Sequence, residues 1–247
     1  MQHPFMNNQQ DAGATGTTRP DDPWLSVIVP ARNEAAGIAD TLAPLQSERD
    51  QGVEVVLVDG ASTDATREQA QPWVDRFVDA APGRAHQMNQ GAAGARAPLL
   101  WFLHADTRMD ARHLQALKRE RRLWGHFRVR LSGRHPLFRV ISFMMNLRSR
   151  LTGISTGDQS LFVRAELFRE EGGFPEQPLM EDVAFSARLR RRAGRPAQLV
   201  PALTTDSRRW ERRGPWRTMI EMWWLRWRYW RGDDPAVLCQ RYERETP

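Results

Sequence analysis

Three short apolar runs, each followed at once by polar residues, constrain the fold of this chain more than any other feature. They span residues 25–29, 53–58 and 99–103 and are rich in Val, Ile and Leu. Runs that are apolar at nearly every position are typical of strands buried on both faces. The segments between them, among them residues 34–45 and 87–95, have the spacing of helices. The sequence therefore predicts an α/β fold with a mostly parallel central sheet and helices on both faces.

The pattern changes after about residue 110. Apolar and Arg side chains alternate over residues 127–131, which predicts a half-exposed, antiparallel strand. Residues 215–231 predict a helix with one apolar face, formed by Trp216, Met219, Ile220, Trp223 and Trp227. The other predicted elements are a strand over residues 73–78 and helices from about residue 65, over residues 110–121 and over residues 181–193.

Polar residues follow each of the three apolar runs. Arg32 and Glu34 follow the first, Asp59 ends the second, and Asp106 follows the third. Because ligands of parallel sheets bind beyond the carboxyl ends of the strands, we expect these side chains to meet in one crevice. Taken singly, each carboxylate could also be a helix cap or a turn residue. A strand-end carboxylate such as Asp106 suits Mg²⁺ or Mn²⁺ that two phosphates already chelate.

Two blocks of the sequence hold most of the surplus positive charge. Residues 112–150 contain 11 basic residues and one acid, and residues 207–231 contain eight Arg, two acids and six of the ten Trp. Such blocks fit an anionic membrane surface at least as well as nucleic acid. A non-catalytic basic module that binds nucleic acid or anionic membrane is therefore the alternative to an enzyme. Carboxylates that converge in one crevice argue against it, because they oppose the binding of a polyanion.

The two ends of the chain differ from its middle. Residues 1–22 lack the basic and apolar segments of a signal peptide, and their composition predicts a disordered tail. We expect a folded domain over residues 23–213 and a basic, Trp-rich amphipathic helical segment over residues 214–247. The single Cys239 allows no internal disulfide, and no apolar run approaches the ~20 residues of a bilayer span. The expected location is the cytoplasm, with peripheral contact at the inner face of the membrane left open.

Four segments carry polar residues in a definite order: Ser26–Glu34, Val58–Asp64, Leu103–Thr107 and Met180–Asp182. Together they resemble the ordered motifs of family 2 glycosyltransferases with the GT-A fold. Arg84–Asn89, Gly157–Gln159 and Arg208–Trp210 resemble, more narrowly, a bacterial subgroup labelled arsenosugar-biosynthesis or radical-SAM/selenodomain-associated glycosyltransferases. The resemblance covers about residues 24–213. It implies a hexosyltransferase-like enzyme that moves a sugar from a nucleotide-diphosphate donor to an unknown acceptor hydroxyl, with inversion and with the help of a divalent metal, and no nucleic acid partner.

The resemblance also implies roles for particular residues. Those that would bind the nucleotide sugar are Pro30, Arg32, Glu34, Asp59, Arg84, Asn89 and Asp106, of which Asp106 would also hold the metal. Those that would border the acceptor and the diphosphate are Gly157, Asp158, Gln159, Arg209 and Trp210. Two positions depart from the family pattern. Gly60 replaces a second acid after Asp59, and His104 replaces the first acid of the usual D-x-D metal motif.

Asp182 matches the catalytic base of the family, and the adjacent Glu181 is the second candidate. Inverting transfer needs a carboxylate that takes the proton of the acceptor hydroxyl as its oxygen attacks the anomeric carbon. The alternative is that both acids only favour the N-terminus of a helix. Two interpretations also remain for residues 215–231: a helix packed on the domain through its Trp face, or a helix anchored in the membrane interface.

Overall fold

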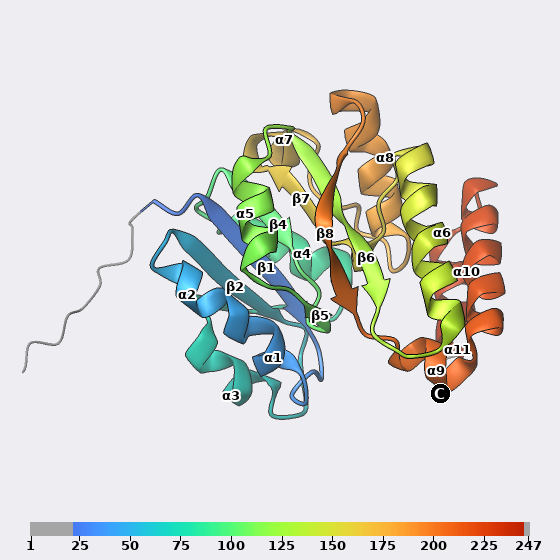
Figure 1. The fold of residues 1–247 in the computed structure, drawn as a ribbon, viewed down its shortest axis with the longest axis horizontal. Helices are drawn as coiled ribbons and strands as arrows, with labels where there is room; N and C mark the ends of the chain where they lie inside the picture. The colour runs from blue at the N-terminus through green and yellow to red at the C-terminus, as the bar shows by residue number, and fades with distance from the viewer. Residues whose placement is uncertain (1–21, 245–247) are drawn as a thin grey trace, which may run out of the picture.

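The computed structural model describes residues 22–244, so the predicted disordered tail lies outside the described residues except for Asp22. The described chain forms one eight-stranded sheet in the order β3-β2-β1-β4-β7-β6-β8-β5. Helices cover both faces of this sheet (Figure 1). The α/β fold class predicted from the three apolar runs is therefore confirmed.

One half of the sheet is parallel. It contains β1 (Leu25–Ala31), β2 (Val53–Asp59), β3 (Arg76–Asp79) and β4 (Leu99–Phe102), with β2 and β4 on either side of β1. Three of these strands follow the predicted runs closely. β3 begins later than predicted, because residues 71–73 form the 3-10 helix η2 (Gln71–Trp73).

The other half of the sheet is mixed. β7 (Leu161–Arg164) runs antiparallel to both β4 and β6 (Trp124–Leu131), while β8 (Ala197–Thr205) runs parallel to β6. The short β5 (Thr107–Arg108) pairs antiparallel with β8 at the edge. The predicted alternation in β6 is confirmed, since Arg128 and Arg130 are exposed between buried neighbours.

The helices connect and cover these strands. On one face lie α1 (Ile38–Leu42), α2 (Gln46–Arg49), α3 (Thr66–Ala70) and α5 (Ala111–Arg119), and on the other lie α4 (Arg84–Ala93), α7 (Ala165–Glu170) and α8 (Glu181–Ala193). Two 3-10 turns, η1 (Ala43–Leu45) and η3 (Gly157–Gln159), complete the connections. The remaining helices are α6 (Pro136–Thr152), α9 (Arg208–Arg213), α10 (Pro215–Trp230) and α11 (Pro235–Arg244).

A separate apolar core lies on each face of the sheet. Trp101 and Phe127 belong to the core shared with α1 and α5, and their ring centroids are 5.4 Å apart. Phe102 and Phe185 belong to the core shared with α4, α7 and α8. Each side chain that alternates along a strand therefore reaches one core or the other, which explains the unbroken apolar runs in the sequence.

The C-terminal helix packs on the domain through a face that the sequence did not single out. Leu225 of α10 is fully buried in a cluster with Met180, which directly precedes α8, and with Leu238 of α11. A buried ion pair between Arg213 and Glu221, with N and O 2.9 Å apart, joins α9 to α10. Segment 214–247 thus contributes apolar side chains to the packing of the domain, in the part of it that the structure describes.

The predicted Trp face of α10 is exposed. Relative exposures are 59% for Trp216, 62% for Ile220, 52% for Trp223 and 49% for Trp227. The interpretation that the helix packs on the domain through its Trp side chains is therefore wrong, although Met219 of the same face packs against the cluster around Phe138 and the helix itself does pack. The helix places Met222 and Leu225 inward, and the larger aromatic side chains are left toward solvent.

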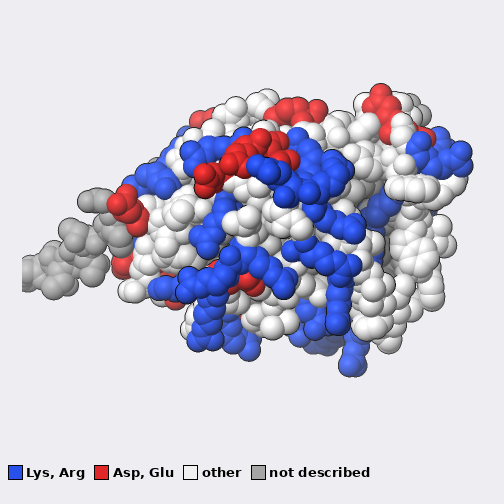
Figure 2. Space-filling model, turned by 90° about the horizontal axis from the view of Figure 1, so that it is seen from above, with Lys and Arg blue, Asp and Glu red and all other residues white. Residues whose placement is uncertain are grey.

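Positive charge also lies far from the strand ends. β6 and β8 point toward the bottom of Figure 1, and Figure 2 views the opposite end of the molecule, where Lys and Arg side chains cover much of the surface.

Among the described residues, no helix has both the length and the apolar character that a bilayer span requires.

Candidate active site

Arg84 stands at the centre of a group of acids from three segments. It is the first residue of α4, and its guanidinium nitrogen lies 3.6 Å from a carboxylate oxygen of Glu181. Burial opposes the charge of Arg84, but Glu181, Asp182, Asp158 and Asp106 outweigh burial and raise its pKa. The structure therefore brings together the end of β4, the turn η3 and the start of α8.

Asp106 follows β4 in a partly buried position. Burial raises the pKa of its carboxyl to about 6, and Asp158, Glu34 and Asp206 add to this effect while Arg84 opposes it. The structure gives this carboxylate no hydrogen bond or ion pair with any other described residue. A carboxylate with free oxygens among other acids fits a divalent cation, which is the role predicted for Asp106.

The other ligands of such a cation would have to come largely from the donor. No three His, Cys, Asp or Glu side chains within residues 22–244 converge on one point that could hold a metal. His104, which replaces the first acid of the D-x-D motif, is neutral near pH 7, because burial and Arg84 lower its pKa to about 3. A single strand-end carboxylate together with diphosphate oxygens is the donor set that these residues allow.

The turn η3 contacts both the residues that follow β4 and the first turn of α8. The backbone N–H of Gly157 donates a hydrogen bond to Asp182 Oδ2, and the Asp158 carboxylate lies 4.0 Å from His104 Nδ1. A Cβ at Gly157 would lie 2.5 Å from His104 Cε1 and 3.2 Å from a nitrogen of Arg84. Only glycine at position 157 permits this close approach.

Glu181 and Asp182 form the first turn of α8. Glu181 is 3% exposed, and burial raises the pKa of its carboxyl against the opposing effect of Arg84. Asp182 is partly exposed, and its Oδ1 accepts a hydrogen bond of 2.7 Å from the N–H of Val183. The helix-terminus alternative therefore describes one contact of Asp182, while Gly157 holds its other oxygen at the site.

The acids that follow β1 and β2 each contact a nearby polar side chain. Asp59 is 7% exposed and accepts hydrogen bonds from the N–H and hydroxyl of Ser62. Glu34 lies 3.5 Å from Arg208, and burial raises the pKa of its carboxyl. Asp59 thus has the contacts of a turn carboxylate in this structure, and its contact with a base stays a prediction.

Gln87 explains the glycine that follows Asp59. The Gln87 side chain donates 2.9 Å hydrogen bonds to the carbonyl oxygens of Ala31 and Val58, which ties the two strand ends together. A Cβ at Gly60 would lie 2.8 Å from the Gln87 amide. The space of the second acid is therefore occupied by an amide from α4, and Gly60 leaves room for it.

Two predicted site residues have structural contacts instead. The Asn89 amide bonds both the N–H and the carbonyl of Phe174 and the carboxylate of Glu176, so it holds the turn before α8. Gln159 is fully buried, and its amide bonds Ser149 and Thr156 behind the η3 turn. These contacts use the polar atoms of both side chains in this structure, and their assignment to the nucleotide and to the acceptor side stays a prediction.

One cavity brings together residues predicted for the donor, for catalysis and for the diphosphate. Arg32, Arg84, Glu181 and Arg209 share its wall with Gln87. Pro30 lies within β1, where it is paired in register with Val58 of β2. Burial and the neighbouring Arg213 and Arg84 lower the pKa of Arg209 to about 10, and its Nε and one terminal nitrogen have no hydrogen-bond partner among the described residues.

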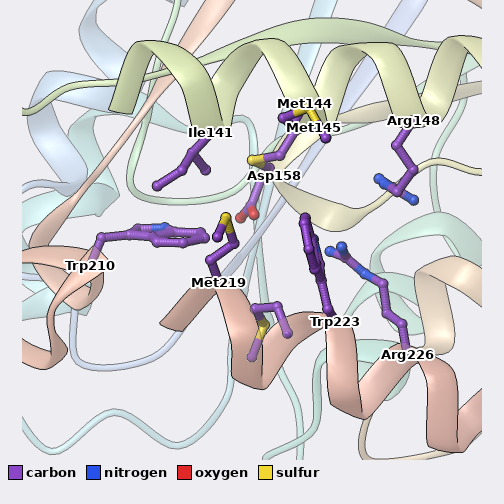
Figure 3. A pocket seen from close by; sticks show the side chains of 10 residues that line it. Ile141, Met144, Met145, Arg148, Asp158, Trp210, Met219, Trp223 and Arg226 are labelled. Carbon is purple, nitrogen blue, oxygen red and sulfur yellow. The ribbon is translucent and has the colours of Figure 1, made fainter. Parts of the chain in front are cut away.

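A second pocket of about 210 Å³ opens between α6 and α10 (Figure 3). Trp210 enters it from α9, and Asp158 lies at its inner side. The predicted acceptor-side residues Asp158 and Trp210 therefore meet in one pocket, beside the turn that holds Asp182. The same pocket contains Arg148 and Arg226, which the sequence motifs did not indicate.

Backbone strain also marks the candidate site. Among residues 22–244, four non-glycine residues have positive φ angles: Asn33, Ala61, Ser160 and Met180, at 55°, 59°, 47° and 64°. They follow β1, β2 and η3 and precede α8. Such conformations cost of order 1–3 kcal/mol each and gather at functional sites. Asn33, Ala61 and Met180 lie within the motifs named above, but nothing in the sequence indicated the strain.

Comparison with known proteins agrees with this arrangement. Residues 26–193 match the family described as Glycosyl transferase family 2. An uncharacterised glycosyltransferase of Mycobacterium tuberculosis is 31% identical over 167 residues, which cover 62% of this chain and 63% of the relative. Validoxylamine A glucosyltransferase of Streptomyces hygroscopicus is 35% identical over 104 residues, or 38% of this chain and 25% of the relative. The matched part is thus less than two thirds of the length of these curated relatives.

Solved structures share the fold. Staphylococcus aureus TarS in complex with UDP has a TM-score of 0.59 at 22% identity, over 74% of this chain and 60% of that one. Mannosyltransferase PcManGT from Pyrobaculum calidifontis, in complex with GDP-Man and Mn²⁺, has a TM-score of 0.56 at 24% identity, over 75% and 56%. These similarities confirm the predicted GT-A fold. With the family match over residues 26–193, they show that the chain belongs to glycosyl transferase family 2.

Proposed function

We propose that this protein transfers a sugar from a nucleotide-diphosphate donor to an acceptor hydroxyl with inversion. The observation that carries the proposal is the meeting of Asp106, Arg84 and Asp182 at the carboxyl end of the parallel strands. Arg84, Arg32 and Arg209 supply positive charge for a diphosphate in one cavity. This arrangement supports an enzyme over the basic-module alternative, which has no use for the acids.

Asp182 would act as the general base. Gly157 and Val183 hold its two oxygens by backbone hydrogen bonds, so the carboxylate has a defined orientation at the start of α8. Asp182 would take the hydroxyl proton while the acceptor oxygen attacks the anomeric carbon and the diphosphate leaves. Glu181, which is buried against Arg84, would position that guanidinium and would not touch the acceptor.

Asp106 would hold a divalent cation, Mg²⁺ or Mn²⁺, which would bind the diphosphate and stabilise its charge as it leaves. The absence of other contacts to the Asp106 carboxylate supports this role. Two similar solved structures, PcManGT and glucosyl-3-phosphoglycerate synthase from Mycobacterium tuberculosis, are complexes with Mn²⁺. The motifs around Arg84, Asp158 and Arg209 resemble those of the arsenosugar-biosynthesis subgroup, and membership of that subgroup is part of this proposal.

The stereochemistry tests the mechanism. The protein would be incubated with a panel of nucleotide sugars and Mn²⁺, and the first-formed sugar product would be followed by NMR before its anomers equilibrate. Attack by a single base-assisted nucleophile predicts a product anomer opposite to that of the donor. A product with the donor's own configuration would contradict the assignment of Asp182 as base.

A further inference from the structure

Two arginines that line the pocket between α6 and α10 do not line the cavity proposed for the donor diphosphate. Arg148 comes from α6 and Arg226 from α10, and their guanidinium groups extend into the same space (Figure 3). Burial and the nearby Arg226 lower the pKa of Arg148 to about 10, and burial lowers the pKa of Arg226. Holding two like charges together in a partly buried pocket has a cost in folding free energy.

Neither guanidinium has an ion-pair partner among the described residues. Arg148 donates only long hydrogen bonds of 3.4 Å, to Ile154 O, Thr156 Oγ1 and Gln159 Oε1, and its Nε donates none. The structure gives Arg226 neither a hydrogen bond nor an ion pair within residues 22–244. Asp158 and Asp182 act on both guanidiniums only electrostatically. Unpaired guanidinium groups of this kind match the oxygens of a phosphate.

The rest of the pocket is apolar. Its other lining residues, apart from Asp158, are Ile141, Met144, Met145, Trp210, Met219, Met222 and Trp223. Methionine side chains adapt to ligands of irregular shape, and four of them line this pocket. The pocket therefore suits a molecule that joins an apolar body to a single anionic group.

The pocket opens on an exposed apolar surface. α6 exposes Val140, Phe143 and Met144, and α10 exposes Trp216, Ile220, Trp223 and Trp227. Met144 and Trp223 also line the pocket, so the surface and the pocket are continuous. Contiguous exposed apolar patches mark interaction sites, and Trp side chains favour the headgroup region of a membrane.

We propose that the acceptor is an anionic lipid whose phosphate lies between its apolar chains and a hydroxyl-bearing head group. This inference rests on the proposed transfer at Asp182. The apolar pocket would hold the chains, Arg148 and Arg226 would bind the phosphate, and the hydroxyl would pass Asp158 toward Asp182. The acceptor O–H bond breaks and its proton goes to Asp182. A glycosidic C–O bond forms, and the donor C–O bond breaks with its electron pair on the diphosphate.

Calorimetric titration with short-chain lipids tests this assignment on the full chain. The probe is dihexanoyl phosphatidylglycerol, which has the anionic phosphate, the hydroxyls and the chains. Dihexanoyl phosphatidylcholine lacks the net charge and the hydroxyls, and glycerol 1-phosphate lacks the chains. We expect both to bind at least about tenfold more weakly than the probe.

The variants separate the pocket from general attraction to an anion. Arg226→Gln and Arg148→Gln should each weaken binding of the probe at least about tenfold, because each removes charged hydrogen bonds to the phosphate. Arg139→Gln removes the same charge from an exposed site on α6 and should change binding less than about twofold. Melting temperatures close to that of the unaltered protein would show that the variants fold. Arg226→Gln serves alone if Arg148→Gln does not fold, since Arg148 contacts η3.

Two results would overturn the inference. One is equal weakening by Arg139→Gln and Arg226→Gln, which would mean surface attraction only. The other is equal affinity for glycerol 1-phosphate and the probe, which would leave the apolar pocket without a role. A nucleoside diphosphate with Mn²⁺ should still raise the melting temperature of every variant. Loss of that response with lipid binding intact would contradict the proposed function and leave the lipid pocket standing.

Discussion

The backbone N–H of Gly157 donates a hydrogen bond to Asp182 Oδ2 and so joins the turn before β7 to the first turn of α8. The two residues are 25 positions apart in sequence. Because His104 packs against Gly157, the end of β4 is held in the same arrangement. The proposed base and the proposed metal ligand are thus positioned by one short turn.

Gly157→Ala should reduce transfer while leaving the protein folded. The new Cβ would lie 2.5 Å from His104, so either the ring or the turn must move, and the hydrogen bond to Asp182 moves with it. A misplacement of ~1 Å at a catalytic group costs about 10²-fold in rate. Gly37→Ala is the matched control, because a Cβ there meets no atom within 4 Å. Equal rates for the two variants, measured with the same donor, would rule out this role of Gly157.

Asp182→Asn should lose transfer and keep donor binding. The amide retains an oxygen that accepts a hydrogen bond but cannot take the acceptor proton, so we expect a loss of about 10² to 10⁴ in kcat. Steady-state kinetics and a nucleotide titration of the same variant separate the two effects. A loss below about tenfold would move the role of base to Glu181.

Acid should destabilise the protein through His126. This ring is fully buried, and burial lowers its pKa from the usual 6.5 to about 4, with a smaller effect of Arg148 and an opposing hydrogen bond to the carbonyl of Phe127. Between these two pKa values the unfolded chain binds a proton that the folded chain does not. Stability is therefore retained above pH 6.5 and falls toward pH 4, by up to ~1.4 kcal/mol per pH unit.

The measurement is urea unfolding at pH 7 and pH 5 for the unaltered protein and for His126→Gln. The variant should show a smaller decrease in the free energy of unfolding over this range, even if it is less stable at pH 7. The same decrease in both proteins would show that other groups cause the acid sensitivity.

The exposed Trp face of α10 should bind anionic vesicles. We expect the protein to pellet with anionic vesicles at low salt, and much less with neutral vesicles or at high salt, because Arg side chains near the surface contribute ~1 kcal/mol each. Trp216→Ser with Trp227→Ser should reduce pelleting and leave the melting temperature unchanged. Trp224→Ser should lower the melting temperature, because Trp224 packs in the cluster around Leu225. Pelleting that ignores the double substitution would contradict membrane contact through this face.

In the parallel half of the sheet, β1, β2 and β4 could be predicted because they are nearly continuous apolar runs, each buried against two cores. β8 was not predicted, since it combines Pro201 with polar residues and most of its side chains are half-buried. A proline within a run argues against a strand, and β8 is recognised as one from its pairing with β6.

The position of Asp106 beyond a buried strand could be predicted from the apolar run before it, whereas Asp158 and Asp182 were indicated by the family resemblance, and the roles of all three stay predictions. The site was not predictable where a contact joins distant segments. The bonds of Asn89 to Phe174 and the packing of Gln87 on Gly60 are of this kind. The interpretation that α10 packs through its Trp side chains was wrong for a related reason. Helical periodicity shows which residues share a face but not which face is covered.

The most direct measurement is the melting temperature with a panel of nucleoside diphosphates, with and without Mn²⁺. A ligand that binds only the folded state raises apparent stability by ~2.7 kcal/mol at 100 times its Kd. The account predicts that at least one nucleoside diphosphate raises the melting temperature only when Mn²⁺ or Mg²⁺ is present, and that Asp106→Ala abolishes this shift while the variant stays folded. A shift of the same size in Asp106→Ala with metal would contradict the site, and no shift with any nucleoside diphosphate would contradict the proposed function.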